Sequence, residues 1–173
     1  VFHTYYRKPR GGGGKRPLTF VVNGGPGASS AFLHVGTVGP KRVECGAEGS
    51  LPAAPARLVD NQETWLAFTD LVFVDPVGTG LSRTVAPENA GDGKEKSPPD
   101  TSYWDANKDL DALCEFIAAF LSREGRWASP IYIAGESYGG YRCAGLVRML
   151  QEKAGIGLSG AMLISPAMEW DNL

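Results

Sequence analysis

Short runs of apolar and β-branched residues alternate along this chain with longer segments in which apolar residues recur every three or four positions. The short runs are typical of buried strands, and the helical spacing is typical of helices with one buried face. Strands are predicted over residues 1–7, 18–22, 71–74, 131–134 and 160–165. Helices are predicted over residues 31–35, 105–123 and 141–153. Because strands alternate with helices, the predicted fold class is α/β with a mostly parallel sheet.

Three further segments show weak periodicity and are predicted to connect these elements. Residues 8–17 contain four consecutive glycines followed by Lys15. A phosphate-binding loop is excluded there, because neither a Ser or Thr nor a helix follows the lysine, and a flexible hairpin connection is favoured. Residues 41–60 are rich in Gly, Pro and Ala and are predicted to be loop with one short strand. Residues 86–100 are polar with mixed charge, which predicts a mobile surface loop.

Composition limits the class of protein. A chain of 173 residues suits one domain, and 43% hydrophobic residues are enough for a sizeable core. The net charge of −2 and the pI near 5.7 offer no basic face for nucleic acid, so no such partner is expected. No run approaches the roughly 18 apolar residues of a membrane span, and none resembles the apolar core of a signal peptide. We therefore expect no membrane partner for these residues.

Three cysteines make an odd count without C-x-x-C spacing: Cys45, Cys114 and Cys143. Cys114 and Cys143 both fall at apolar positions of predicted helices, which favours buried free thiols. One disulfide with a leftover thiol stays open as an alternative. The cysteines therefore leave the cellular compartment undecided.

A serine stands at the junction of the strand predicted over 131–134 and the helix that follows it. Gly135, Ser137 and Gly139 form the G-x-S-x-G pattern of a nucleophile elbow. A chain that turns from strand to helix within two residues strains the middle residue, and glycines leave clearance where a Cβ would collide with backbone. The Ser137 hydroxyl would then stand off the sheet beside a helix N-terminus that favours negative charge. A Gly-Ser-Gly turn without chemistry is the less favoured alternative.

A second glycine-rich loop, Asn23-Gly-Gly-Pro-Gly27, directly follows the strand predicted over 18–22. Three glycines after a buried strand indicate that the backbone itself approaches something closely. In an α/β-hydrolase, the loop after this strand donates one N–H of the oxyanion hole, and the residue after the nucleophile, here Tyr138, donates the other. Each donor is typically worth about 3–4 kcal/mol of transition-state stabilisation. The two glycine-rich loops are therefore best explained together.

Three segments together resemble the serine carboxypeptidase family: Asn23-Gly-Gly-Pro-Gly27 with Ser29 and Ser30, Asp75-Pro-Val-Gly-Thr-Gly80, and Gly135-Glu-Ser-Tyr-Gly139. They occur in the family's order and span nearly the whole chain. The resemblance implies an α/β-hydrolase-type fold, a mostly parallel sheet with helices on both faces, of which residues 1–173 would form the N-terminal half. It also implies removal of single residues from the free C-terminus of a peptide through an acyl-enzyme, without metal or cofactor. The family is mostly secretory.

By motif position, the resemblance makes Ser137 the nucleophile and assigns the oxyanion hole to the N–H groups of Gly25 and Tyr138. It assigns the substrate's terminal carboxylate to three residues: Asn23, the Gly24 backbone and Glu136. A glutamate binds a carboxylate only when one of the two carries a proton, which is a physical reason for an acidic optimum.

The chain departs from the family pattern at three places. Ala28 stands where the family commonly has a cysteine, so one usual disulfide is missing, and in this the chain resembles bacterial members. Thr37 stands where the family often has a second glutamate paired with the equivalent of Glu136, so the carboxyl pair that shares a proton is lost. Residues 139–142 are Gly-Gly-Tyr-Arg instead of Ala-Gly-His-Tyr, which we expect to alter packing or pocket shape without loss of chemistry.

The catalytic base and acid are not found after the nucleophile. Ser137 needs a general base, and that base needs an orienting acid. In this fold both follow the nucleophile, whereas His3 and His34, the only histidines, precede it. Asp75 also precedes it, so we expect it to cap the next turn. The acid and base would come from a second chain or a missing C-terminal part, and residues 1–173 alone are expected to be almost inactive.

Three functions remain after the sequence is considered. The first is a serine carboxypeptidase-like peptide hydrolase that carries its nucleophile in this chain. The second is an esterase or acyltransferase on the same scaffold, which the loss of the second glutamate at Thr37 keeps open. The third is a non-catalytic interaction protein that has kept the elbow and lost the triad.

Overall fold

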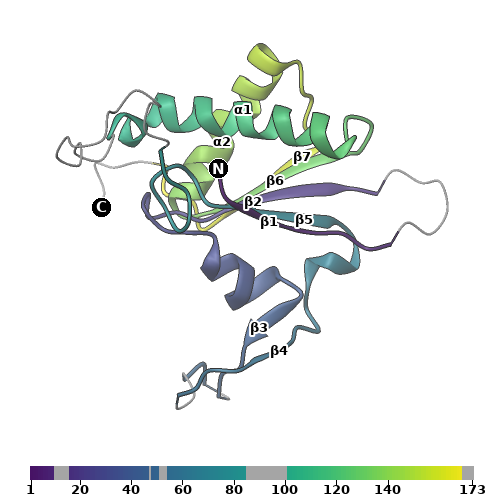
Figure 1. The fold of residues 1–173 in the computed structure, drawn as a ribbon, viewed down its shortest axis with the longest axis vertical. Helices are drawn as coiled ribbons and strands as arrows, with labels where there is room; N and C mark the ends of the chain where they lie inside the picture. Colours follow the sequence, from purple (N-terminus) through teal and green to yellow (C-terminus); the bar gives the residue numbers. More distant parts are fainter. Residues whose placement is uncertain (10–15, 47, 51–53, 85–100, 169–173) are drawn as a thin grey trace, which may run out of the picture.

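A five-stranded sheet forms the centre of the computed structural model (Figure 1), which describes residues 1–9, 16–46, 48–50, 54–84 and 101–168. The strands are β1 (His3–Tyr6), β2 (Leu18–Val22), β5 (Asp70–Val74), β6 (Ile131–Glu136) and β7 (Gly160–Ile164). Their order is β1-β5-β2-β6-β7, and only β1 is antiparallel to its neighbour. The α/β class, the mostly parallel sheet and the five predicted strands are confirmed.

The predicted hairpin between the first two strands is wrong. β1 pairs with β5, with His3 opposite Val74, so β5 lies between β1 and β2. All five residues of β2 are buried, and this strand pairs on both sides with parallel neighbours. The residues of β1 are only partly buried, which suits an edge position. Residues 10–15 of the connection lie outside the described ranges.

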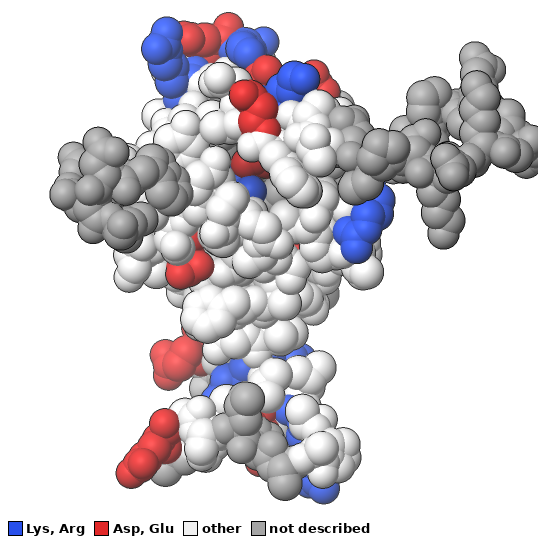
Figure 2. Space-filling model, turned by 90° about the vertical axis from the view of Figure 1, so that its left-hand side faces the viewer, with Lys and Arg blue, Asp and Glu red and all other residues white. Residues whose placement is uncertain are grey.

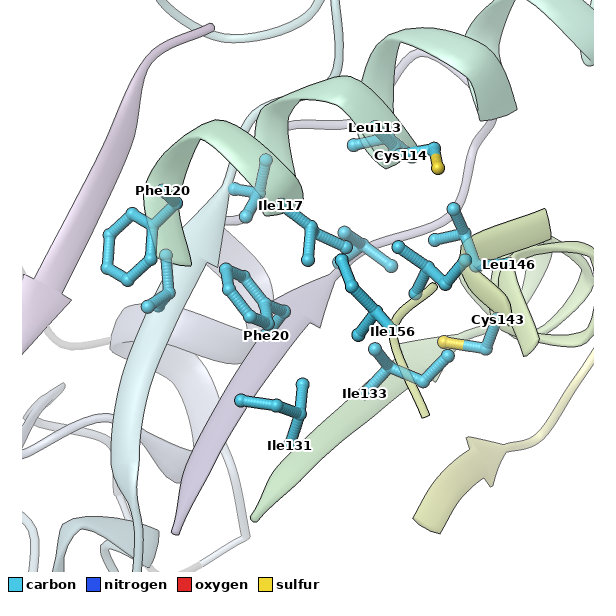
Figure 3. Close-up of a cluster of buried hydrophobic side chains, with 14 of the residues drawn as sticks. Phe20, Leu113, Cys114, Ile117, Phe120, Ile131, Ile133, Cys143, Leu146 and Ile156 are labelled. Atoms are coloured by element: carbon cyan, nitrogen blue, oxygen red, sulfur yellow. The ribbon is translucent and has the colours of Figure 1, made fainter. Parts of the chain in front are cut away.

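Two α-helices cover one face of the sheet. Helix α1 (Ala106–Glu124) begins at Asp105, whose carboxylate accepts hydrogen bonds from the N–H groups of Asn107 and Lys108. Helix α2 (Tyr138–Ala154) follows the nucleophile directly. Figure 3 shows the apolar stripes of both helices meeting above the sheet, and the main core lies there. The predicted long amphipathic helix is confirmed.

The opposite face is covered by helices of other types. The π-helix η1 (Phe32–Val38) places Leu33 and Val38 on a second core that includes Leu71 and Phe73. The 3₁₀ helix η2 (Trp65–Ala67) packs against the same core, and a second 3₁₀ helix, η3 (Ser102–Trp104), precedes α1. Both faces of the sheet therefore carry helices.

The segment predicted as loop with one short strand contains two. Strand β3 (Lys41–Val43) pairs with β4 (Leu58–Asp60) in an antiparallel ribbon that projects from the sheet (Figure 1). Each strand has only three residues, which is too short for a periodic pattern to be recognised. The polar loop predicted over 86–100 lies outside the described residues.

A buried ion network closes the sheet at the end where β5 begins. Arg126 is 5% exposed; its Nη1 donates to Asp70 Oδ2 at 2.7 Å, and its Nη2 donates to the Arg16 carbonyl at 2.9 Å. Arg16 Nε donates to the other Asp70 oxygen at 2.7 Å. A buried carboxylate paired in this way is strongly destabilised when one partner is removed. This network fixes the sheet at the end opposite to the loops that follow the parallel strands.

The cysteines are free thiols, and two of them are buried, as predicted. Cys114 and Cys143 lie in the core between α1, α2 and the sheet (Figure 3), whereas Cys45 is exposed. Burial raises the pKa of the Cys143 thiol to about 12. Among the residues that the structure describes, no helix combines the length and apolar character that a membrane span requires.

Candidate active site

Ser137 occupies a strained turn between the last residue of β6 and the first residue of α2. Its backbone has φ 55° and ψ −120°, a region that non-glycine residues rarely adopt. A Cβ on Gly135 would overlap the backbone of Gly139, and a Cβ on Gly139 would lie 2.5 Å from the Val22 carbonyl oxygen. Both flanking glycines are therefore required by close backbone approach. The predicted elbow geometry is confirmed.

The end of β7 holds the elbow in place. The Ser137 N–H donates to the Ile164 carbonyl at 3.0 Å, and the Ser137 carbonyl accepts from the N–H groups of Gly140 at 2.9 Å and Ala167 at 3.1 Å. Backbone strain persists only where surrounding contacts determine it. These three bonds provide that restraint, so β7, the segment after it and the first turn of α2 together fix the Ser137 backbone.

The loop after β2 lies directly against the elbow. A Cβ on Gly24 would be 2.6 Å from the Tyr138 nitrogen and 2.8 Å from the Ser137 Cβ. The Ala28 N–H donates to the Gly24 carbonyl at 3.2 Å. Because a trans peptide is planar, this bond also fixes the direction of the Gly25 N–H on the same peptide unit. The loop that carries the first predicted oxyanion donor thus touches the residue that carries the second.

Asn23 and Glu136, predicted to share a carboxylate site, are hydrogen-bonded to each other. The Asn23 Oδ1 accepts from the Leu33 N–H at 3.0 Å, which fixes the orientation of the amide. Its Nδ2 consequently donates to Glu136 Oε2 at 3.2 Å. Asn23 is 1% exposed. A Cβ on the adjacent Gly24 would lie 2.8 Å from the Glu136 carbonyl oxygen, so the two backbones approach closely. Five of the six predicted site residues therefore meet at the carboxyl edge of β2 and β6, and Gly25 follows Gly24 in the same loop.

Asp75 has the structural role that its position in the sequence predicts. Its Oδ1 accepts from the N–H and hydroxyl of Ser30 at 2.8 and 2.9 Å, and its Oδ2 accepts from the Leu81 N–H at 3.0 Å. The residue is 4% exposed. Each hydrogen bond to a buried charge contributes about 1.5–3 kcal/mol. Asp75 therefore caps its own turn and also ties the β5 loop to the β2 loop.

Arg142 and Asp109 contact the site loops and were missed as site residues from the sequence. Arg142 is 2% exposed on the first turns of α2, and its Nε donates to Asp109 Oδ2 of α1 at 2.6 Å. Its Nη1 and Nη2 donate to the carbonyls of Asn23 and Pro26, each at 2.9 Å. One signal for a buried ion pair was available in the sequence: each predicted helix has a charged residue directly before an apolar position. These are Asp109 before Leu110 and Arg142 before Cys143.

The two histidines lie away from Ser137. β5 and β2 separate His3 on β1 from β6, and with neighbouring strands about 4.8 Å apart the two backbones are roughly 14 Å apart. His34 Nε2 shares a hydrogen bond of 2.8 Å with the Tyr6 hydroxyl, and its ring stacks on Phe73 at 4.5 Å. Burial lowers the pKa of both imidazoles. Neither ring is placed to accept the Ser137 proton.

Thr37 bonds within its own helix. Its hydroxyl donates to the Leu33 carbonyl at 3.1 Å inside η1. Glu136, in turn, has the Asn23 amide as its side-chain partner. In the described part of the chain, no His, Cys, Asp and Glu side chains gather in threes to hold a metal ion.

The site loops open on the carboxyl edge of the parallel strands. Figure 2 looks onto this side of the molecule, where most side chains in the middle are uncharged, a few charged ones lie among them, and further charged ones gather at the top and bottom. A serine on a strained strand-to-helix turn, beside a glycine-rich loop from the neighbouring parallel strand, defines an α/β-hydrolase-type site. The fold and the elbow thus give the chain the architecture of an α/β-hydrolase.

Comparison with known sequences identifies the family within this class. The sequence profile of the serine carboxypeptidase family matches residues 2–172, so the chain belongs to the serine carboxypeptidase family. It is 29% identical to serine carboxypeptidase-like 8 of Arabidopsis thaliana over 98% of this chain. It is 35% identical to serine carboxypeptidase 1 of Hordeum vulgare over 73% of this chain. It is 34% identical to the pheromone-processing carboxypeptidase KEX1 of Saccharomyces cerevisiae over 72% of this chain.

The chain spans only part of the length of these relatives. The aligned segments make up 37%, 23% and 16% of the Arabidopsis, Hordeum and Saccharomyces proteins, respectively.

Proposed function

We propose that this chain supplies the nucleophile and the oxyanion hole of a serine-type carboxypeptidase that acts through an acyl-enzyme on Ser137. The observation that carries the proposal is the contact between Gly24 and the elbow, with a Cβ position 2.6 Å from the Tyr138 nitrogen. This contact brings the loop of Gly25 to the N–H of Tyr138. An acyl-transfer site needs two such donors beside its nucleophile.

The chemistry follows from these positions. The Ser137 oxygen attacks the last peptide carbonyl, and its proton passes to a general base. The carbonyl oxygen becomes negatively charged and accepts hydrogen bonds from the N–H groups of Gly25 and Tyr138. The C–N bond then breaks, the amino group takes the proton, and the C-terminal amino acid leaves. Water hydrolyses the acyl-enzyme by the same steps.

The terminal carboxylate of the peptide would bind beside Asn23, the Gly24 N–H and Glu136. The hydrogen bond of 3.2 Å between Asn23 and Glu136 supports this, because it holds the two side chains on one side of the elbow. Two carboxyl groups hydrogen-bond to each other only when one is protonated. Binding of a peptide with a free C-terminus is therefore expected to strengthen as the pH falls.

The Asp and His of the triad are proposed to come from the remainder of the enzyme, as a second chain or as further sequence. Ser137 lies beside β7, which pairs only with β6 among the described strands. Leu163 of β7 is 45% exposed, and an apolar edge strand is suited to pairing with more of the sheet. We expect that remainder to dock at this edge and to bring the base to Ser137.

Labelling with a fluorophosphonate serine probe tests the proposal. The native protein is expected to be labelled at Ser137, and Ser137→Ala is expected to abolish that labelling. Residues 1–173 alone are expected to label far more slowly, since loss of the base histidine of a triad costs on the order of 10⁶-fold in rate. Absence of labelling in the native protein would favour the non-catalytic interaction protein. Rapid labelling of residues 1–173 alone would refute the need for an external base.

An esterase or acyltransferase is the second candidate, and the surroundings of Glu136 support it. Its side-chain partner is an amide, and the Thr37 hydroxyl bonds inside η1. A blocked dipeptide with a free carboxylate should be compared with its C-terminal amide and with a small ester. A carboxypeptidase is expected to require the free carboxylate, whereas an esterase is expected to cleave the ester and ignore the carboxylate.

A further inference from the structure

Arg142 joins three segments through polar bonds: helix α2, helix α1 and the loop after β2. It projects from α2, its Nε binds Asp109 of α1 at 2.6 Å, and its two terminal nitrogens bind carbonyls of the β2 loop at 2.9 Å. Those carbonyls belong to Asn23 and Pro26, which flank Gly24 and Gly25 in the chain. The guanidinium carbon also lies 4.8 Å from the centre of the Tyr138 ring.

These bonds determine the direction of backbone donors. The carbonyl of Asn23 and the N–H of Gly24 belong to one planar peptide unit and point in opposite directions. Because Arg142 binds that carbonyl, the Gly24 N–H points away from Arg142. The bond to Pro26 holds the other side of the same short turn. Arg142 therefore sets the plane of the Asn23–Gly24 peptide. Because it holds the carbonyls of Asn23 and Pro26, it also limits the movement of the Gly25 N–H that lies between them.

From this arrangement we infer that Arg142 is a positioning residue, held by Asp109, that sets the oxyanion and carboxylate donors of the β2 loop against the elbow. This inference rests on the proposed function of Ser137. Arg142 touches no reacting atom and acts through the carbonyls of Asn23 and Pro26. Because it starts from α2, the helix that carries the Tyr138 N–H, it ties both oxyanion donors to one rigid element.

The geometry requires arginine. A guanidinium has a planar fork that can serve three acceptors at once, whereas a lysine ammonium is a single point on a flexible stem. Asp109 is 4% exposed and compensates the buried charge, so the cation does not need water. Arg142→Lys keeps the charge and loses the simultaneous bonds to Asn23, Pro26 and Asp109.

The test compares Arg142→Lys with Arg126→Lys in the native protein. Arg126 is a matched control, because it is also buried, binds one aspartate at 2.7 Å and one carbonyl at 2.9 Å, and lies at the opposite end of the sheet. Two quantities are measured: the second-order rate of fluorophosphonate labelling at Ser137, and amide hydrogen exchange in residues 23–28. We expect Arg142→Lys to slow labelling about 10- to 100-fold, since misplacement by 1 Å costs on the order of 10²-fold. Exchange at the Ala28 amide should rise at the same time.

Arg126→Lys is expected to lower the melting temperature while leaving the labelling rate within about 3-fold of the native protein. Equal slowing by both variants would mean a general loss of stability and would overturn the inference. If the native protein is not labelled, the proposed function fails, and exchange in residues 23–28 still decides the inference. Unchanged exchange there in Arg142→Lys overturns it. Asp109→Asn is the second variant if Arg142→Lys does not fold, with smaller changes expected in the same direction.

Discussion

Gly24→Ala tests the contact between the β2 loop and the elbow directly. The added Cβ would lie 2.6 Å from the Tyr138 nitrogen and 2.8 Å from both the Glu136 carbonyl oxygen and the Ser137 Cβ. Ordinary contacts begin near 3.4 Å, so the loop has to move away by about 0.6–0.8 Å. The atoms that it meets belong to the elbow, which is fixed to β7, so we expect the loop to move instead.

The expected consequence is a large loss of reactivity with a moderate loss of stability. A displacement approaching 1 Å costs on the order of 10²-fold in rate, and loss of one oxyanion donor costs a similar amount. Overpacking typically costs about 1–3 kcal/mol of unfolding free energy. Fluorophosphonate labelling of the native protein at Ser137 measures the first quantity, and denaturant unfolding measures the second.

Gly27→Ala is the matched control for this prediction. It lies in the same loop, and a Cβ there would have no neighbour within 4 Å. We expect labelling at the native rate. If Gly24→Ala also labels at the native rate and unfolds at the native denaturant concentration, the β2 loop does not lie against the elbow, and the argument for the oxyanion hole fails with it.

Two further predictions concern buried titratable groups. At pH 8, iodoacetamide is expected to modify Cys45 and to leave Cys143 unmodified until the protein is unfolded, because burial raises the Cys143 pKa to about 12; peptide mapping that finds both modified at similar rates would contradict this. Burial lowers the pKa of His34, so below the ordinary value of 6.5 the unfolded chain binds more protons than the folded chain, and stability falls as the pH drops. We expect His34→Asn to reduce the decline in unfolding free energy between pH 7 and 5.5, and an unchanged decline would show that His34 does not cause it.

Much of the fold could be predicted because its signals are local. The strands β2 and β6 are short apolar runs, and the elbow needs glycines at fixed positions that a Cβ would not tolerate. The α1 helix combines an apolar stripe with an aspartate cap. Each of these signals depends on neighbours within a few residues in the chain.

Other features depend on distant partners and could not be predicted. β1 is followed in sequence by β2 but pairs with β5, since two parallel neighbours bury β2 more completely. The position of η1 depends on its packing with Phe73 and on the bond between Asn23 and Leu33. Arg142 looked like a departure from a family motif, and its role depends on Asp109, 33 positions earlier in the chain.

The strand order also bears on when the site can form during synthesis. Asn23 and Glu136 meet although they are 113 positions apart, and the strand that carries Glu136 is the partner of β2 on the side away from β5. β1, β2 and β5 can pair as soon as Val74 has been synthesised, and Asp75 can then fix one side of the β2 loop. The other side of the β2 loop gains its partners only after α2 has been synthesised, because Tyr138 and Arg142 belong to that helix. At about 5–20 residues per second, a nascent chain spends several seconds with the glycine-rich loop formed and no serine beside it. A reactive centre therefore cannot arise until most of this sheet has already been built.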